Sequence, residues 1–221
     1  MKNVMQPEKT AKHVMNKHGV ELARLARNFG VRREDFVSFL KNKKRTDKFF
    51  NGLNTDNWFT NLQAEAKKIG ARIHLITNLS VDYTKPHNDA AMTGGPQTES
   101  NYNVLKVADL YQPSENKVTT ETIILFNWPN GGGNYQKAIE WGLSNNLLKT
   151  TPHVPFAIGE NYPKLNYELG SNPMYVVETT GCTFGSYPNA CDVWWHDAER
   201  KSYLDWQSYF GYSYDWFAFR K

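Results

Sequence analysis

The sequence is poor in the features that mark secreted, membrane-spanning and zinc-binding proteins. Its 221 residues include two cysteines, Cys182 and Cys191, which lie nine positions apart without a C-x-x-C spacing. Neither a disulfide framework nor a cysteine zinc site is therefore indicated, and we expect free thiols. No apolar run approaches the roughly 18 residues that a membrane span requires, and the first residues lack a signal peptide's apolar core. We expect a cytoplasmic protein with no membrane partner.

Signatures of the common enzyme classes are also missing. The sequence contains no G-x-S-x-G for a serine nucleophile, no G-K-S/T phosphate loop and no G-x-G-x-x-G dinucleotide fingerprint. Its carboxylates show no spacing that singles out a catalytic pair. Any catalytic group has to be sought in less specific patterns.

Charge is distributed unevenly along the chain. Residues 1–50 hold 13 Lys/Arg and 5 Asp/Glu, so their net charge is 13 − 5 = +8. Residues 51–221 hold 13 Lys/Arg and 17 Asp/Glu, a net charge of 13 − 17 = −4, and the two parts add up to +4. A short basic segment before a slightly acidic body is typical of a nucleic-acid-contacting module attached to another domain. A solvated, lysine-rich helical face is the alternative.

Apolar residues recur at three- and four-residue spacing between Val14 and Leu40, which predicts two or three short helices. Gly30 interrupts the pattern, as expected of a turn between two helices. Residues 20–41, from Val20 to Lys41, resemble the helix-turn-helix DNA-binding family of phage-repressor type. Small Ala26 stands at the helix crossing, and apolar residues such as Leu25 hold the pair together. A helical hairpin used for packing or protein contact is the alternative.

This resemblance implies that the second helix enters the major groove of DNA with its first turn against the base edges. Arg32 or Arg33 would pair with a guanine edge, and Ser38 would lie on the same outward side. The residues that would follow the phosphates are Lys41, Lys43, Lys44 and Arg45. Members of the family commonly form dimers, so a homodimer is a further expectation.

A polar segment around residues 51–57 predicts a domain boundary. We therefore expect a basic helical domain over residues 1–52 and an α+β domain over residues 53–221, because strands and helices alternate in mixed order. Within the second domain the patterns predict helices over residues 58–69, 135–148 and 197–209. They predict strands over residues 72–77, 102–110, 121–127, 154–158 and 174–178 and around 193–195, with strand-like alternation over 214–218.

The pair His87 and Asp89 is the first candidate for chemistry in this second domain. In an extended chain both side chains point to one side and could bind one metal ion. The pair resembles the His-x-Asp motif of Fe(II)/2-oxoglutarate dioxygenases. The resemblance implies Fe(II) as cofactor, His153 as the distal ligand, and Lys164 as the basic residue for the cosubstrate carboxylate. A turn whose side chains cap the backbone is the alternative.

Gly131, Gly132 and Gly133 form the second candidate, a loop between a predicted strand and a predicted helix. Backbone N–H groups at such a helix start can reach a phosphate or a coenzyme A pyrophosphate. The order of strand, glycine-rich loop, helix and strand is similar to the acetyl-coenzyme A site of N-acetyltransferases. A plain surface turn is the alternative.

Aromatic residues are concentrated at the C-terminus, where they make up 11 of the last 30 residues. Core packing is the default role for such residues, and an exposed remainder would form a protein-docking patch.

These sequence features lead to three hypotheses about function. The first is a DNA-binding protein of regulatory or mobile-element type, whose second domain senses, oligomerises or modifies. The second is a metal-dependent enzyme, and the third a non-enzymatic interaction or inhibitor protein.

Overall fold

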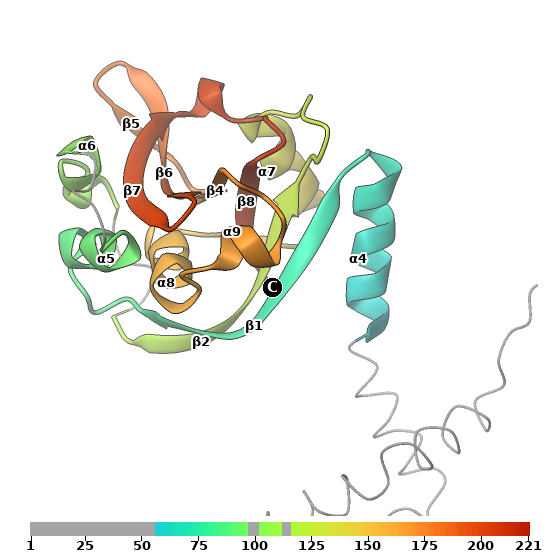
Figure 1. Ribbon diagram of the computed structural model, residues 1–221, viewed down its shortest axis with the longest axis horizontal. Helices are drawn as coiled ribbons and strands as arrows, with labels where there is room; N and C mark the ends of the chain where they lie inside the picture. Colours follow the sequence, from blue (N-terminus) through green and yellow to red (C-terminus); the bar gives the residue numbers. More distant parts are fainter. Residues whose placement is uncertain (1–55, 97–101, 112–115) are drawn as a thin grey trace, which may run out of the picture. The chain divides into compact units, whose positions relative to one another are not determined.

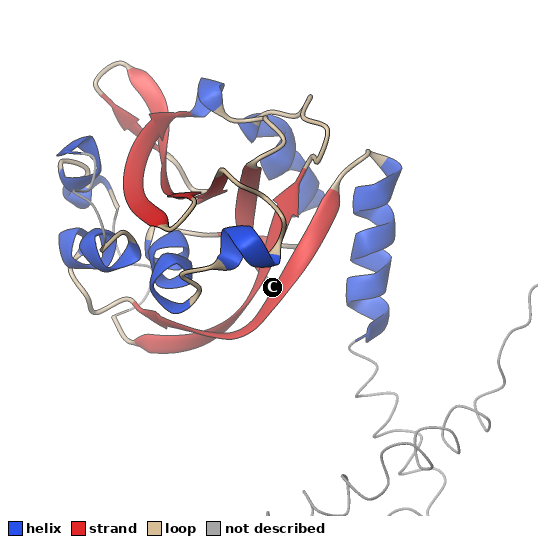
Figure 2. Cartoon of the chain, in the orientation of Figure 1, coloured by secondary structure: helices blue, strands red, loops and turns tan. Residues whose placement is uncertain are grey.

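The computed structural model describes residues 56–96, 102–111 and 116–221 (Figures 1 and 2). The chain divides into two compact units, Met1–Thr60 and Asn61–Lys221. The predicted helix-turn-helix over residues 20–41 and the predicted domain over residues 1–52 lie outside the described residues.

The described residues form six α-helices, two 3₁₀ helices and eight strands. The helices are α4 (Asp56–Lys68), α5 (His87–Gly94), α6 (Tyr102–Leu105), η1 (Ala108–Leu110), α7 (Tyr135–Ser144), α8 (His153–Asn161), α9 (Leu165–Glu168) and η2 (Gln207–Tyr209). The strands are β1 (Arg72–Asp82), β2 (Val118–Asn127), β3 (Leu148–Lys149), β4 (Met174–Val177), β5 (Cys182–Phe184), β6 (Tyr187–His196), β7 (Glu199–Trp206) and β8 (Asp215–Arg220). This mixture confirms the predicted α+β class for the body.

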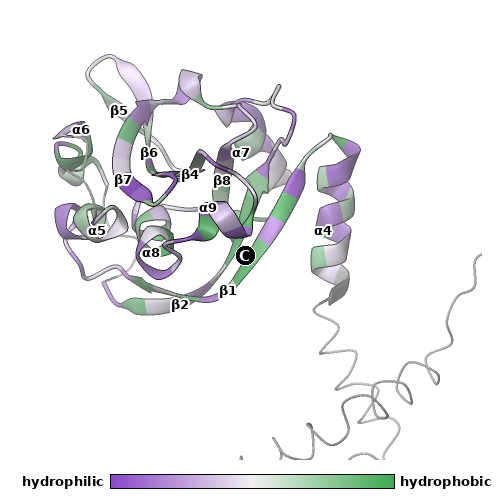
Figure 3. Ribbon diagram, viewed as in Figure 1, coloured by the Kyte–Doolittle hydropathy of each residue, from purple (hydrophilic) through white to green (hydrophobic). Residues whose placement is uncertain are grey.

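All eight strands belong to one sheet. Its main order is β1-β2-β8-β4-β6-β5, with β3 also paired to β8 and β7 also paired to β6. The β4–β8 pairing is parallel and the other pairings are antiparallel. Figure 3 shows hydrophilic and hydrophobic residues alternating along β1, as expected of a strand at the sheet edge with one face buried.

Helices cover the sheet on both faces. On one face, which we call the inner face, Val154 and Phe156 of α8 belong to the same buried cluster as Val176 of β4 and Trp216 of β8. Helix α5 crosses α8 at two glycines, because a Cβ on Gly159 would lie 2.4 Å from the carbonyl oxygen of Gly94. Both glycines are thus required by the close approach of the two backbones.

On the opposite face, which we call the outer face, helix α7 covers the β2–β8 part of the sheet. The rings of Phe126 and Trp141 stack at 4.2 Å between centroids, and Trp141 also contacts Phe219. A Cβ on Gly142 would lie 2.2 Å from the Phe219 ring, so the helix lies directly on the aromatic layer. Several aromatic residues of the C-terminal region are therefore core residues, as expected.

Three of the predicted elements are wrong. Residues 154–158 form helix α8 instead of a strand. The pattern suggested a strand because this helix is buried on nearly all sides, and its continuous apolar run resembles that of a buried strand. Residues 102–110 form α6 and η1. Val104 of α6 and Val107, which lies between the two helices, are both buried. Residues 199–206 form strand β7 instead of a helix. The alternation of buried positions was not visible in the sequence, because two of these positions hold the polar residues Arg200 and Ser202.

The other predicted elements are confirmed with changed bounds. The strand predicted over 72–77 extends to Asp82, and the helix predicted over 135–148 ends at Ser144. The strands predicted over 121–127, 174–178 and 193–195 correspond to β2, β4 and β6, and the alternation at the C-terminus corresponds to β8. None of the described helices has both the length and the apolar character that a membrane crossing requires.

Candidate functional site

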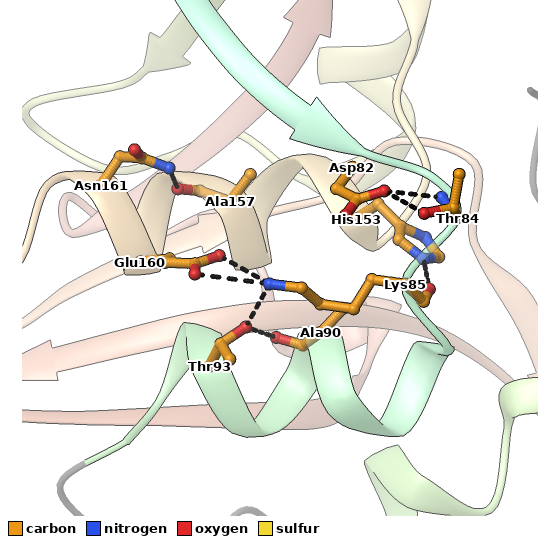
Figure 4. Close-up of polar contacts among 9 residues, drawn as sticks. All are labelled: Asp82, Thr84, Lys85, Ala90, Thr93, His153, Ala157, Glu160 and Asn161. Carbon is orange, nitrogen blue, oxygen red and sulfur yellow. Dashed lines mark hydrogen bonds and ion pairs between the residues drawn. The ribbon is translucent and has the colours of Figure 1, made fainter. Parts of the chain in front are cut away.

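A polar pocket lies where the end of β1 meets helices α5 and α8 (Figure 4). Its volume is about 280 Å³. The residues that line it come from β1, β2, α5, α8 and the turn after β1; they are Ser80, Asp82, Lys85, Ala90, Thr93, Val118, His153, Phe156, Ala157, Glu160 and Asn161. The pocket lining thus combines charged side chains of both signs with a few apolar side chains.

The turn after β1 places Lys85 at this pocket. Asp82 Oδ1 accepts hydrogen bonds from the backbone N–H of Thr84, over 2.9 Å, and from the Thr84 hydroxyl, over 2.6 Å. An aspartate that binds the backbone two residues ahead closes a tight turn. The Thr84 hydroxyl is the main cause that lowers the pKa of Asp82, so its carboxylate carries a negative charge at neutral pH.

An ion pair between the turn after β1 and helix α8 crosses the pocket. Lys85 Nζ lies 3.1 Å from Glu160 Oε2 on α8, and it donates to Thr93 Oγ1 on α5 over 3.4 Å. The side chains of Lys85 and Glu160 remain 25% and 45% exposed. Because water still screens such a pair, it adds little to stability. Both groups are instead open to a ligand, which could replace either partner with a charge of its own.

Two histidines lie beside the pocket, each held by a backbone carbonyl. His153 Nε2 is 2.9 Å from the Lys85 carbonyl oxygen, and His87 Nε2 is 2.8 Å from that of Val104. A carbonyl can only accept, so both Nε2 atoms carry a proton. Each Nδ1 is buried, and neither has a hydrogen-bond partner among the described residues. Burial is the main cause that lowers the pKa of His87, which keeps that ring neutral.

The structure brings together only part of the predicted iron set. The rings of His87 and His153 lie 6.4 Å apart, but Asp89 is exposed on the first turn of α5. The extended conformation assumed for His87 and Asp89 is wrong, because residues two apart on a helix point in nearly opposite directions. Within the described residues, no three His, Cys, Asp or Glu side chains are grouped so as to hold a metal ion. Lys164 is exposed at the start of α9.

Backbone conformation accounts for Gly131 and Gly132 of the predicted anion loop, and packing accounts for Gly133. Gly131 has a positive φ of 70°, and a Cβ on Gly133 would lie 2.0 Å from the Trp128 ring. Gly132 also has a positive φ, of 86°. The Asn134 side chain caps α7 by accepting from the Lys137 N–H over 2.8 Å, so it satisfies one N–H that an anion would otherwise use.

A second polar centre lies at the end of β4 and was missed by the sequence patterns. Glu178 is fully buried, and it accepts hydrogen bonds from the Tyr111 hydroxyl and from the N–H groups of Thr180, Gly181 and Cys191. Burial raises the pKa of Glu178 to about 7, and the four groups that donate to it act in the opposite direction. The sequence signal for this centre was a glutamate at the end of an apolar stretch, followed by Thr-Thr-Gly. A turn at such a position can supply backbone N–H donors to the glutamate carboxylate.

The remaining predicted site residues have different positions. Arg32, Arg33, Ser38, Lys41, Lys43, Lys44 and Arg45 lie outside the described residues. In the aromatic C-terminal region, Trp195, Trp216, Phe217 and Phe219 are buried, whereas Trp206, Tyr209 and Tyr212 are exposed. The Trp206 ring stacks on exposed Tyr187 at 5.1 Å.

Comparison with known proteins gives no further assignment. No protein-family model, no curated protein and no solved structure matches this chain. The function must therefore be argued from the residues themselves.

Proposed function

We propose that this protein binds DNA through its basic first 50 residues and senses a small polar ligand through its α+β body. The observation that carries the DNA-binding part is the separation of charge, +8 over residues 1–50 and −4 over residues 51–221. The helix-turn-helix pattern over residues 20–41 lies in the basic part. Arg32 or Arg33 then contacts a base edge, and the basic residues after them contact phosphates.

The pocket between β1, α5 and α8 supports the sensing part. Its volume of about 280 Å³ is near the lower end of the range for small-molecule sites, so the ligand is small. Lys85 offers an ammonium group to an acidic ligand group, and Glu160 offers a carboxylate to a basic one. A zwitterion of amino-acid size satisfies both.

An iron-dependent oxygenase has less support. Two histidines near each other are only part of the predicted triad, and Asp89 lies on an exposed turn away from their buried Nδ1 atoms. The observations therefore favour the role of sensor over the enzymatic one.

The DNA-binding proposal is tested by fluorescence anisotropy of the full chain with labelled duplex DNA at several salt concentrations. We expect the logarithm of the binding constant to fall linearly with the logarithm of the salt concentration. Changing Arg32→Ala and Arg33→Ala together should weaken binding about tenfold or more. The matched control is Lys67→Ala with Lys68→Ala, which removes two charges from the last turn of α4.

Equal losses in the two double variants would show that charge alone, and not the predicted recognition helix, determines binding. Absence of binding at low salt would refute the DNA-binding proposal. The sensing part is tested separately, by thermal shift with each free amino acid. At least one should raise the melting temperature, and Lys85→Met should remove that shift while Lys137→Met on α7 should keep it. If no amino acid has an effect, or if Lys85→Met leaves it unchanged, the sensing proposal fails.

A further inference from the structure

The outer face of the sheet carries three aspartates on neighbouring strands. Strand pairing sets Asp192 of β6 opposite Val177 of β4 and Tyr203 of β7. It sets Asp205 of β7 opposite Ala190. Asp215 of β8 lies opposite Tyr175 of β4. Residues opposite each other, or two apart along a strand, share a face. All three carboxylates therefore lie on the face opposite to α5 and α8.

Asp192 differs from its neighbours because it is buried without a partner. Its exposed fraction is 0%, and neither carboxylate oxygen has a hydrogen-bond partner among the described residues. Asp215, in contrast, accepts from the Gly211 and Tyr212 N–H groups over 2.7 and 2.8 Å. A buried carboxylate without donors is costly, and burial raises the pKa of Asp192. The described part of the chain thus leaves this carboxyl group without a partner that would stabilise its charge.

Aromatic residues share this face with Asp192. Tyr203 lies opposite it on β7, and Trp194 lies two positions along β6, opposite Tyr175 of β4. Tyr175, Trp194, Tyr203 and Tyr214 are all partly exposed. The rings of Tyr175 and Tyr214 lie 5.5 Å apart, and those of Trp194 and Tyr203 lie 6.3 Å apart. Faces of such rings attract cations. Lys201 Nζ lies 5.4 Å from the centre of the Trp194 ring, so one of these rings, which together we call the rim, already contacts an ammonium group.

The surrounding sequence supplies few cations to balance these acids. Residues 165–219 contain seven acidic residues but only two basic ones, Arg200 and Lys201. Arg200 is buried on the inner face, where its Nε donates to the Gly94 carbonyl over 2.7 Å. Lys201 lies 3.8 Å from Glu199 as well as over Trp194. Neither of these contacts supplies a donor to Asp192.

We propose that this face, with Asp192 at its centre, binds a guanidinium or primary ammonium group of an organic cation. The cation donates N–H bonds to Asp192 and lays its charge against the rings of Tyr175, Trp194, Tyr203 and Tyr214. The two free oxygens of Asp192 match the parallel N–H groups of a guanidinium. A quaternary ammonium has no N–H donors and cannot satisfy these oxygens. Because Asp192 itself is fully buried, binding requires the partly exposed rings above it to move aside.

Isothermal titration calorimetry of the full chain with agmatine, in phosphate buffer free of amines, tests this proposal. Agmatine carries both a guanidinium and a primary ammonium group. We expect saturable binding that Asp192→Asn weakens at least about tenfold. The matched control, Asp109→Asn, removes a carboxylate from exposed η1 and should leave binding unchanged. Tetramethylammonium should bind at least about tenfold more weakly than agmatine.

A second variant keeps the test decisive if Asp192→Asn disturbs the fold, which circular dichroism would reveal. Trp194→Leu keeps an apolar side chain but removes a ring from the rim, and it should weaken agmatine binding several-fold. The proposal is overturned if agmatine does not bind at millimolar concentration. It is also overturned if tetramethylammonium binds as tightly, or if folded Asp192→Asn and Trp194→Leu both bind agmatine like the unaltered chain.

Discussion

The hydroxyl of Tyr111 donates a hydrogen bond of 2.8 Å to Oε1 of Glu178 inside the core. The two residues are 67 positions apart in the sequence. Tyr111 follows η1 directly and Glu178 follows β4, so this bond ties a connecting segment to the centre of the sheet. Because both side chains are buried, water cannot replace a lost partner.

Removing the donor should destabilise the protein. For Tyr111→Phe we expect the free energy of unfolding to fall by about 1–3 kcal/mol, because a buried acceptor loses a hydrogen bond while the ring is kept. Urea unfolding followed by circular dichroism measures this. Tyr102→Phe, at a side chain that is 70% exposed, is the control and should have little effect. Equal stability of the two variants would show that the buried bond contributes nothing.

Glu178 should make stability depend on pH. Its pKa is about 7 in the folded protein against 4.5 for the ordinary group, because burial disfavours the charged form. The folded state therefore holds a proton that the unfolded state has released between these values. The resulting stabilisation is fully present below about pH 4.5 and is lost as pH rises to about 7, amounting to about 3 kcal/mol.

Comparison of Glu178→Gln with the unaltered chain isolates this contribution, since other buried acids such as Asp215 change stability in the same direction. Urea unfolding at pH 5 and pH 7 should show a smaller loss of stability for Glu178→Gln than for the unaltered chain. Asp109→Asn should lose as much stability as the unaltered chain. An identical loss in all three proteins would mean that Glu178 does not take up a proton on folding.

Gly142 should not tolerate a side chain, although alanine is the better helix former. A Cβ at this position in α7 would lie 2.2 Å from the ring of Phe219, which is fully buried. We expect Gly142→Ala to lower the melting temperature, with a cost of about 1–3 kcal/mol from overpacking. Gln136→Ala on the exposed side of the same helix is the control. A stabilised Gly142→Ala variant would show that α7 can move away from the sheet.

The ion pair of Lys85 and Glu160 should matter more for binding than for folding. Because both side chains are partly exposed, Glu160→Gln should change the free energy of unfolding by less than about 1 kcal/mol. It should nevertheless remove the thermal shift produced by the amino acid that binds. A large loss of stability on this change would assign the pair a structural role instead.

Sequence patterns predicted the elements whose burial follows a simple period. The amphipathic pattern of α7 could be read directly, because one face of this helix is apolar. Helix α8 could not, since burial on all sides removes the polar stripe that reveals a helix. Strand β7 was missed because buried Arg200 and Ser202 find partners in the carbonyls of Gly94 and Ala91, which lie far away in the sequence.

The same division holds for the sites. The sequence by itself determined the separation of charge, the mixed α+β class of the body and the concentration of aromatic residues at the C-terminus. Only the tertiary structure decided that Lys85 meets Glu160 and that Asp192 is buried without a donor. Composition and spacing record residue types, whereas a site depends on which distant residues the sheet and its helices bring together. Contacts between residues that lie tens of positions apart produce no periodic pattern in a single sequence.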